Sequence, residues 1–157
     1  MTDPAGKGTA VPRGADADVE AGVAFAQKMW ADDEASRRLG MEALVIEQDH
    51  AVVRMPIRED MVNGHDICHG GFVFTLADST FALACNSRGK VTVASGADIT
   101  FTAPSRLGDI LVSEATVRSA FGRSGITDVT VKRESDSQIV AEFRGRSRSL
   151  RPSGVDG

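Results

Sequence analysis

The chain has 157 residues, of which 41% are hydrophobic and 25% charged, a composition typical of one soluble globular domain. Its net charge of −4 argues against nucleic acid as the main partner, and no apolar run reaches the roughly 18–20 residues of a membrane-spanning helix. Two cysteines exclude a disulfide-built scaffold, and the first residues show no secretory signal, so we expect a cytoplasmic protein that contacts no membrane.

The two ends of the chain differ in composition from the region between them. Residues 1–17 are rich in Gly, Ala, Pro and Asp and contain almost no large apolar side chain, and residues 152–157 are similar. Such segments bury too little apolar surface to offset the entropy lost on ordering, so both ends are predicted to be disordered. One domain is expected over residues 18–151.

A helix, a hairpin and a loop are predicted in the first part of the domain. Residues 18–30 carry apolar side chains at helical spacing, which indicates an amphipathic helix. Residues 43–47 and 51–57 are rich in β-branched residues with a period near two, which indicates two strands joined as a hairpin. Residues 58–69 are polar, contain glycine and show no period, so a loop is expected there.

The longest apolar stretch, at residues 70–86, predicts a central helix that ends before Gly89. This helix is apolar almost all round, so the rest of the fold has to enclose it. Four strand-like segments rich in Val, Ile and Thr follow, at residues 91–101, 110–121, 125–133 and 139–150. Their length implies a large curved sheet. The expected fold class is α+β, with a long antiparallel β-sheet wrapped around a central α-helix.

Two glycines, Gly70 and Gly71, begin the predicted central helix. Glycine lets a ligand approach the backbone closely, and the free N–H groups of a first helical turn carry partial positive charge. Both residues are therefore candidates for binding a substrate whose carbonyl oxygen develops negative charge. The alternative interpretation is a glycine-rich N-cap that binds no ligand.

Asp78 is the only ionisable residue between His69 and Arg88, and its neighbours at helical spacing are apolar. Helix interiors disfavour Asp, and burying an unpaired carboxylate costs several kcal/mol. Such a carboxylate either takes part in chemistry or has a structural partner, here a neighbouring loop or a second subunit. Asp78 is therefore a candidate catalytic residue.

A metal site is the other chemistry considered for the loop before this helix. His65, Asp66, Cys68 and His69 include residue types that bind zinc. A structural zinc site normally has four ligands in two paired clusters, and the sequence has no second cluster. We therefore expect no metal. The sequence also lacks the GxSxG, P-loop and GxGxxG motifs.

Several motifs lie in and around the predicted central helix: NGHDICHGG at residues 63–71, FTLAD at residues 74–78 and FALACNSRG at residues 81–89. DITF at residues 98–101 and AEFRG at residues 141–145 follow in the predicted strands. Together these motifs resemble those of a known family, the PaaI-type thioesterases of phenylacetate degradation, which belong to the hotdog-fold superfamily. The resemblance extends over about residues 20–150.

The resemblance implies a hotdog fold in which two subunits join their sheets edge to edge, with active sites at the interface of the homodimer. Pairs of such dimers usually form homotetramers. It also implies that Asp78 is the nucleophile or the general base on a thioester, and that the N–H of Gly70 polarises the thioester carbonyl. By the same resemblance, Asn63 positions the attacking water or the substrate. His69 supports the loop and is counted with Asp78, Gly70 and Asn63 as a candidate catalytic residue.

Coenzyme A is the partner that the resemblance implies, as part of the substrate, and no cofactor is expected. Arg144, Arg146 and Arg148 alternate along one predicted strand and therefore project from one face. Arg123 lies in a predicted turn. All four arginines are candidates for binding the phosphates of coenzyme A.

The expected function is hydrolysis of phenylacetyl-CoA, hydroxyphenylacetyl-CoA or related aryl thioesters to the free acid and coenzyme A. Two alternatives stay open: a thioesterase for medium-chain aliphatic acyl-CoA, and a noncatalytic sensor that binds acyl-CoA. The apolar surroundings of Asp78 favour catalysis, because a protein that only binds would avoid an unpaired buried charge.

Overall fold

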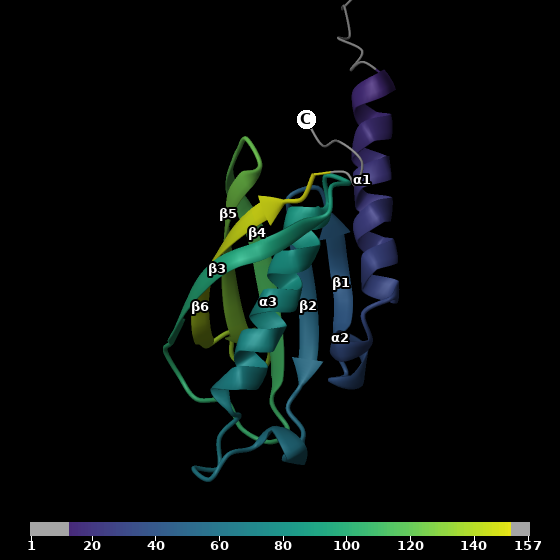
Figure 1. Cartoon of the computed structure of the whole chain (residues 1–157). Helices are drawn as coiled ribbons and strands as arrows, with labels where there is room; N and C mark the ends of the chain where they lie inside the picture. The colour runs from purple at the N-terminus through teal and green to yellow at the C-terminus, as the bar shows by residue number, and fades with distance from the viewer. Residues whose placement is uncertain (1–12, 152–157) are drawn as a thin grey trace, which may run out of the picture.

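The computed structural model describes residues 13–151 of the chain (Figure 1). Residues 1–12 and 152–157, for which disorder was predicted, lie outside the described residues. Residues 13–17 are helical, in contrast to the prediction, because helix α1 spans Arg13–Ala31 and starts five residues before the expected helix at residues 18–30. The apolar spacing that indicated this helix begins only at about residue 18, so the first turn of α1 carried no signal.

The sheet has six strands in the order β1-β2-β4-β5-β6-β3, and every neighbouring pair is antiparallel. The predicted hairpin and the four predicted later strands are confirmed, with ends that agree within one residue for most of them. Their bounds are β1 Glu42–Glu47, β2 His50–Pro56, β3 Thr92–Phe101, β4 Ile110–Phe121, β5 Ser124–Arg133 and β6 Ile139–Ser149.

The central helix α3, Gly70–Asn86, has the predicted bounds and lies across one face of the curved sheet (Figure 1). One side of α3 contributes the fully buried Leu76, Phe81 and Leu83. The inward side chains of the strands meet them, because alternate residues of a strand point to the same face of the sheet. These strand residues are Val53, Met55, Leu111, Ala115, Val129, Val131 and Phe143. The predicted α+β hotdog architecture is therefore confirmed.

Helix α1 stands beside β1 and contacts the C-terminal end of α3, while its first turns extend past the sheet (Figure 1). Gly22 permits this close approach, because a Cβ atom at that position would collide with the backbone of Ser87. Two short helices were not predicted: α2, Glu34–Arg38, and the 3-10 helix η1, Glu59–Met61. No helix within residues 13–151 combines the length and the apolar character needed to cross a membrane.

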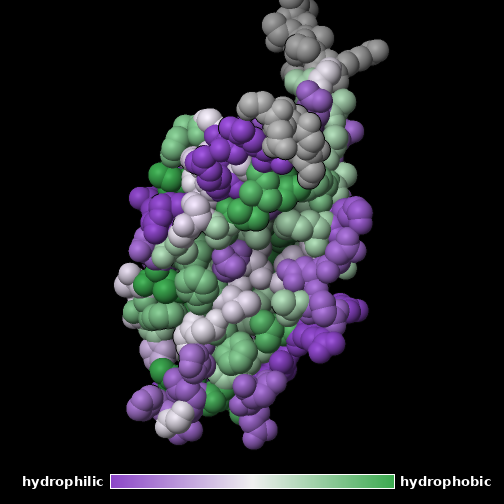
Figure 2. All heavy atoms as spheres, viewed as in Figure 1, coloured by the Kyte–Doolittle hydropathy of each residue, from purple (hydrophilic) through white to green (hydrophobic). Residues whose placement is uncertain are grey.

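The side of α3 that faces away from the sheet is left partly uncovered. Phe74, Thr75, Asp78, Ala82 and Cys85 follow one another along this side and are only half-buried. Figure 2 shows that apolar surface reaches the outside on the face of the molecule where α3 lies. This stripe of half-buried residues includes the one carboxylate of the helix.

Candidate active site

The loop before α3 forms a tight turn that starts at Asn63. The Asn63 backbone N–H donates to the Ile67 carbonyl at 2.9 Å, and the Asn63 Oδ1 accepts the His65 N–H at 2.9 Å. Asp66 closes the turn with φ of 58°, in the left-handed region that Asp tolerates better than most residues. Oδ1 holds the turn, and the Asn63 amide nitrogen, which donates to no acceptor within residues 13–151, is free for a substrate or a water.

His69 is the N-cap of α3. Its Nδ1 accepts the N–H of Gly71 at 2.9 Å, and its own N–H donates to the Met61 carbonyl at 2.8 Å. A ring nitrogen that accepts a hydrogen bond has to be deprotonated, so this cap requires the neutral imidazole with its proton on Nε2. His69 therefore supports the loop and the helix start. Gly71 was predicted to bind the substrate, but its backbone N–H already donates to the His69 ring.

Gly70 is the first residue of α3, and its N–H donates to no acceptor within residues 13–151. The ring of Phe101, the last residue of β3, lies directly against it: a Cβ atom at Gly70 would be 2.9 Å from the Phe101 Cζ. The absence of a side chain at Gly70 allows the ring to lie this close without shifting. The Gly70 N–H is thus a free backbone donor at the partially positive N-terminus of the helix.

Asp78 lies in the middle of α3 and is half-buried. Burial raises the pKa of its carboxyl above the ordinary value, and no cation or hydrogen-bond donor in the described part of the chain offsets that effect. Its negative charge also contributes to the raised pKa of the Cys85 thiol, which is about 12 mainly because of burial. Cys85 is therefore protonated and inert at neutral pH, whereas Asp78 is a carboxylate without a partner.

Gly70 and Asp78 of one chain are separated along the helix. Eight residues at a rise of 1.5 Å place their backbones about 12 Å apart. A thioester carbonyl held at the Gly70 N–H is therefore out of reach of the Asp78 carboxylate of the same chain. The two groups can meet on one substrate only if they come from two copies of the chain.

A pocket of about 490 Å³ opens beside the start of α3. Asn63 and Gly70 both line it, so the structure brings two of the predicted site residues together. The rest of the lining is mostly apolar and comes from the loop, α3, the end of β3, the segment after it, and β6. These residues are Ile67, Cys68, Val73, Phe101, Thr102, Ala103, Pro104, Ser105 and Val140. Such a pocket suits an apolar acyl group with its carbonyl directed at Gly70.

The alternating arginines of β6 share one exposed face, as predicted, but two of them are already paired. Arg144 donates to both carboxylate oxygens of Asp128, at 2.6 and 2.8 Å, and Arg146 donates to Asp98 at 2.5 Å. Arg148 contacts only the hydroxyl of Ser124, at 3.5 Å. Arg148 is thus the one of the three whose charge is not opposed by a carboxylate within residues 13–151.

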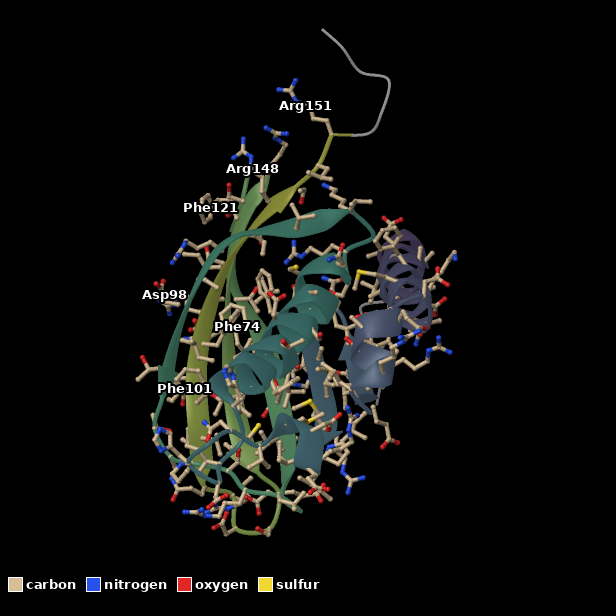
Figure 3. The ribbon with its side chains drawn as sticks, turned by 60° about the horizontal axis from the view of Figure 1, so that its bottom comes forward. Phe74, Asp98, Phe101, Phe121, Arg148 and Arg151 are labelled. Atoms are coloured by element: carbon tan, nitrogen blue, oxygen red, sulfur yellow. The ribbon has the colours of Figure 1, made fainter. Side chains whose placement is uncertain are left out.

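Arg123 lies at the opposite end of the domain from the Gly70 pocket, in the turn between β4 and β5. It lines a second pocket of about 480 Å³ together with Lys90 and Arg151. Apolar side chains from Val91 and Leu150 complete the wall. Figure 3 shows Arg148 and Arg151 at this same end, near Phe121. We call the cations Lys90, Arg123, Arg148 and Arg151 the basic end.

Known thioesterases share both the sequence motifs and the fold of this chain. A family model described as "Thioesterase superfamily" matches residues 65–140. The acyl-coenzyme A thioesterase PaaI of Escherichia coli is 38% identical over 125 residues, which cover 80% of this chain and 89% of that protein. The chain belongs to the PaaI-type thioesterases of the hotdog-fold superfamily.

Solved structures and a human relative agree with this membership. The structure of the E. coli PaaI protein from the phenylacetic acid degradation operon has a TM-score of 0.81 at 36% identity, covering 85% of this chain and 96% of that one. A mutant of the phenylacetic acid degradation protein PaaI from Thermus thermophilus has a TM-score of 0.72 at 33% identity, covering 75% and 100%. Human Acyl-coenzyme A thioesterase 13 is 32% identical over 69% of this chain and 79% of its own length.

In this PaaI-type chain, two of the residues that suggested a metal, Cys68 and His69, make hydrogen bonds within the loop and the helix start. The buried Cys68 thiol donates to the His69 carbonyl at 3.6 Å, and the His69 Nδ1 is occupied by Gly71. Residues 13–151 contain no group of three or more His, Cys, Asp or Glu side chains placed to bind a metal ion.

The lining residues of the two pockets that were not predicted as site residues include Phe101, Lys90 and Arg151. Phe101 was counted only as part of a strand and of the DITF motif, although an aromatic residue just before Thr102-Ala103-Pro104 marks the strand end. Lys90 and Arg151 were not singled out, because only the register of the sheet brings them next to Arg123.

Proposed function

We propose that this thioesterase hydrolyses arylacetyl thioesters of coenzyme A, with phenylacetyl-CoA and its ring-hydroxylated forms as substrates. The observation that carries the proposal is the combination on α3 of a free N–H at Gly70 and an unpaired, half-buried carboxylate at Asp78. The apolar pocket next to Gly70 is suited to an aryl group. The E. coli relative, named for acyl-CoA thioesterase activity, supports the coenzyme A part of the substrate.

In the proposed mechanism, the thioester carbonyl oxygen accepts a hydrogen bond from Gly70 N–H. The helix dipole and this donor stabilise the negative charge that develops on the oxygen during attack. Asp78 either attacks the carbonyl carbon, giving an anhydride that water then hydrolyses, or removes a proton from water that attacks directly. In both routes the C–S bond breaks, the thiolate of coenzyme A leaves and takes up a proton, and the acid is released.

The site is proposed to be shared between two subunits. The separation of about 12 Å between Gly70 and Asp78 requires a second copy of the chain to complete the constellation. Two features support this arrangement: β3 is an edge strand of the sheet, and it exposes Val93 and Phe101. The uncovered, half-buried stripe of α3 is the surface that such a copy would cover. Light scattering is expected to give a dimer or a tetramer, and a fully active monomer would contradict the shared site.

The basic end is proposed to bind the phosphates of coenzyme A. Lys90, Arg123 and Arg151 surround one pocket, so three cations are available to a multiply charged anion there. Arg144 and Arg146 are less suited to this role, since carboxylates already neutralise them. Arg148, near the same end, remains a candidate.

Substitution of Arg123 tests this assignment. Arg123→Ala is expected to raise KM for acyl-CoA about 5- to 20-fold with little change in kcat, because a phosphate contact is present equally in the ground state and the transition state. The matched control is Arg144→Ala, which removes an arginine already paired with Asp128 and is expected to leave KM within about twofold. Equal effects of both variants on KM would contradict a phosphate site at the basic end.

A thiol-release assay over a panel of acyl-CoA substrates tests the proposed substrate class. We expect the highest kcat/KM for phenylacetyl-CoA and hydroxyphenylacetyl-CoA, with Asp78→Asn as the measure of background hydrolysis. A higher kcat/KM for hexanoyl-CoA or octanoyl-CoA would establish the aliphatic alternative. Tight binding of acyl-CoA without thiol release would establish a sensor instead.

A further inference from the structure

The ring of Phe101 occupies a position that the proposed chemistry does not yet use. Phe101 is the last residue of β3, and 52% of its surface is exposed. Its Cζ is so close to Gly70 that a Cβ atom there would be 2.9 Å away. Figure 3 shows Phe101 beside the N-terminal part of α3. An exposed apolar ring thus lies next to Gly70, the residue whose N–H is proposed to bind the thioester carbonyl.

Phe101 also belongs to the wall of the 490 Å³ pocket that opens at Gly70. The other described residues of this wall are aliphatic, small or polar, so Phe101 supplies the only aromatic face among them. In an arylacetyl thioester, a single CH₂ group separates the ring from the carbonyl carbon. A ring attached in this way has to lie close to Gly70 when the carbonyl oxygen is bound there. Within this pocket, such a ring is in reach of the Phe101 ring.

We propose that Phe101 is a specificity-determining residue that favours aryl over alkyl acyl groups by packing its ring against the ring of the substrate. This inference rests on the proposed function, because it assumes that the carbonyl binds at Gly70. Two aromatic rings in an edge-to-face or offset arrangement attract each other beyond the effect of buried area alone. A saturated ring of similar size gains the area but not this additional attraction.

Phenylacetyl-CoA and cyclohexylacetyl-CoA form the matched pair of substrates for the test, because they differ mainly in the aromatic character of the ring. The wild-type enzyme is expected to prefer phenylacetyl-CoA in kcat/KM by about 3- to 10-fold, the scale of an aromatic pair. Phe101→Leu keeps an apolar side chain but removes the aromatic ring, so this preference is expected to fall to about 1. Phe101→Tyr keeps the ring and is expected to retain the preference.

Phe121→Leu is the matched control. Phe121 is 56% exposed, close to the value for Phe101, but lies at the end of β4 near the basic end, away from the Gly70 pocket. This variant is expected to keep the wild-type ratio. Light scattering and thermal unfolding of all variants identify any change in assembly or folding, which would lower turnover of both substrates together.

The possible results distinguish a wrong inference about Phe101 from a wrong proposed function. If Phe101→Leu and wild type show the same phenyl-to-cyclohexyl ratio, Phe101 does not select the acyl group and the inference is wrong, while the proposed function stands. If wild type hydrolyses neither of these thioesters, the proposed arylacetyl function is wrong and the inference falls with it. A lost preference in Phe101→Leu with a retained one in Phe101→Tyr supports both.

Discussion

Replacing Asp78 by Asn is expected to lower kcat by at least about 10²-fold, the scale on which a positioned acid–base group contributes. The amide keeps the size of the carboxylate but has neither the negative charge nor the basic oxygen. KM for acyl-CoA is expected to change little, because the pocket at Gly70 and the basic end are untouched. Steady-state thiol release from phenylacetyl-CoA measures both parameters. Near-normal turnover by a folded Asp78→Asn enzyme would contradict the catalytic role.

The same substitution is expected to stabilise the protein at neutral pH. Burial raises the pKa of Asp78, so this group contributes stability that is present at low pH and is lost as the pH rises through its folded-state pKa. Asn carries no charge, so the variant does not lose this stability at neutral pH. Its free energy of unfolding is expected to be higher than that of wild type by about 0.5–2 kcal/mol, the range of single stabilising substitutions. The difference in Tm between variant and wild type is expected to be largest near pH 8 and to shrink toward pH 4. A variant less stable than wild type at pH 8 would instead indicate a structural hydrogen-bond network around Asp78.

Replacing Gly70 by Pro is the second prediction with a large expected effect. Proline has no N–H and is well tolerated at the first residue of a helix, which is the position of Gly70. The preceding His69 has φ of −61° and ψ of 131°, a conformation that suits the residue before proline. The helix is therefore expected to persist while the proposed carbonyl donor is lost. Removing one donor of this kind lowers kcat by about 10²–10³-fold.

Gly70→Ala is the matched control for this substitution. Alanine keeps the N–H but brings the same Cβ atom against the Phe101 ring, at 2.9 Å before any adjustment. Because half of the Phe101 side chain is exposed, the ring can shift, and we expect kcat within about 10-fold of wild type. Equal losses in Gly70→Ala and Gly70→Pro would mean that crowding at Phe101, and not the missing N–H, causes the effect.

The elements that the sequence predicted well are those whose pattern is local and strong. The apolar run from Gly70 to Asn86 and the alternating strands have lengths and periods that only one kind of element satisfies. Helix α2 was missed because its five residues, Glu34–Arg38, are polar except for one alanine and carry no apolar period. Its start is capped by Asp33, whose carboxylate accepts the Ser36 N–H at 3.0 Å and the Ser36 hydroxyl at 2.6 Å.

The residues of the candidate site were likewise predictable only where the sequence pattern is local. Asp78 and Gly70 could be found from the sequence because a lone carboxylate and a glycine pair stand out within one helix. The pairing of Arg144 with Asp128 could not, since the two residues come from different strands and meet through the register of β5 and β6. The contact between Phe101 and Gly70 likewise joins β3 to α3 across the fold. Contacts of this kind depend on tertiary structure, which no local pattern encodes.

A complementation experiment tests the central claim, that Gly70 of one subunit and Asp78 of another act on one thioester. Gly70→Pro and Asp78→Asn proteins are each expected to be nearly inactive, and both are mixed in equal amounts, unfolded and refolded together. In a shared site, every mixed dimer contains one intact pair, so the mixture is expected to recover about a quarter of wild-type activity per subunit. If the mixture is no more active than the mean of the two separate variants, Gly70 and Asp78 act within one subunit. That result would contradict the shared site.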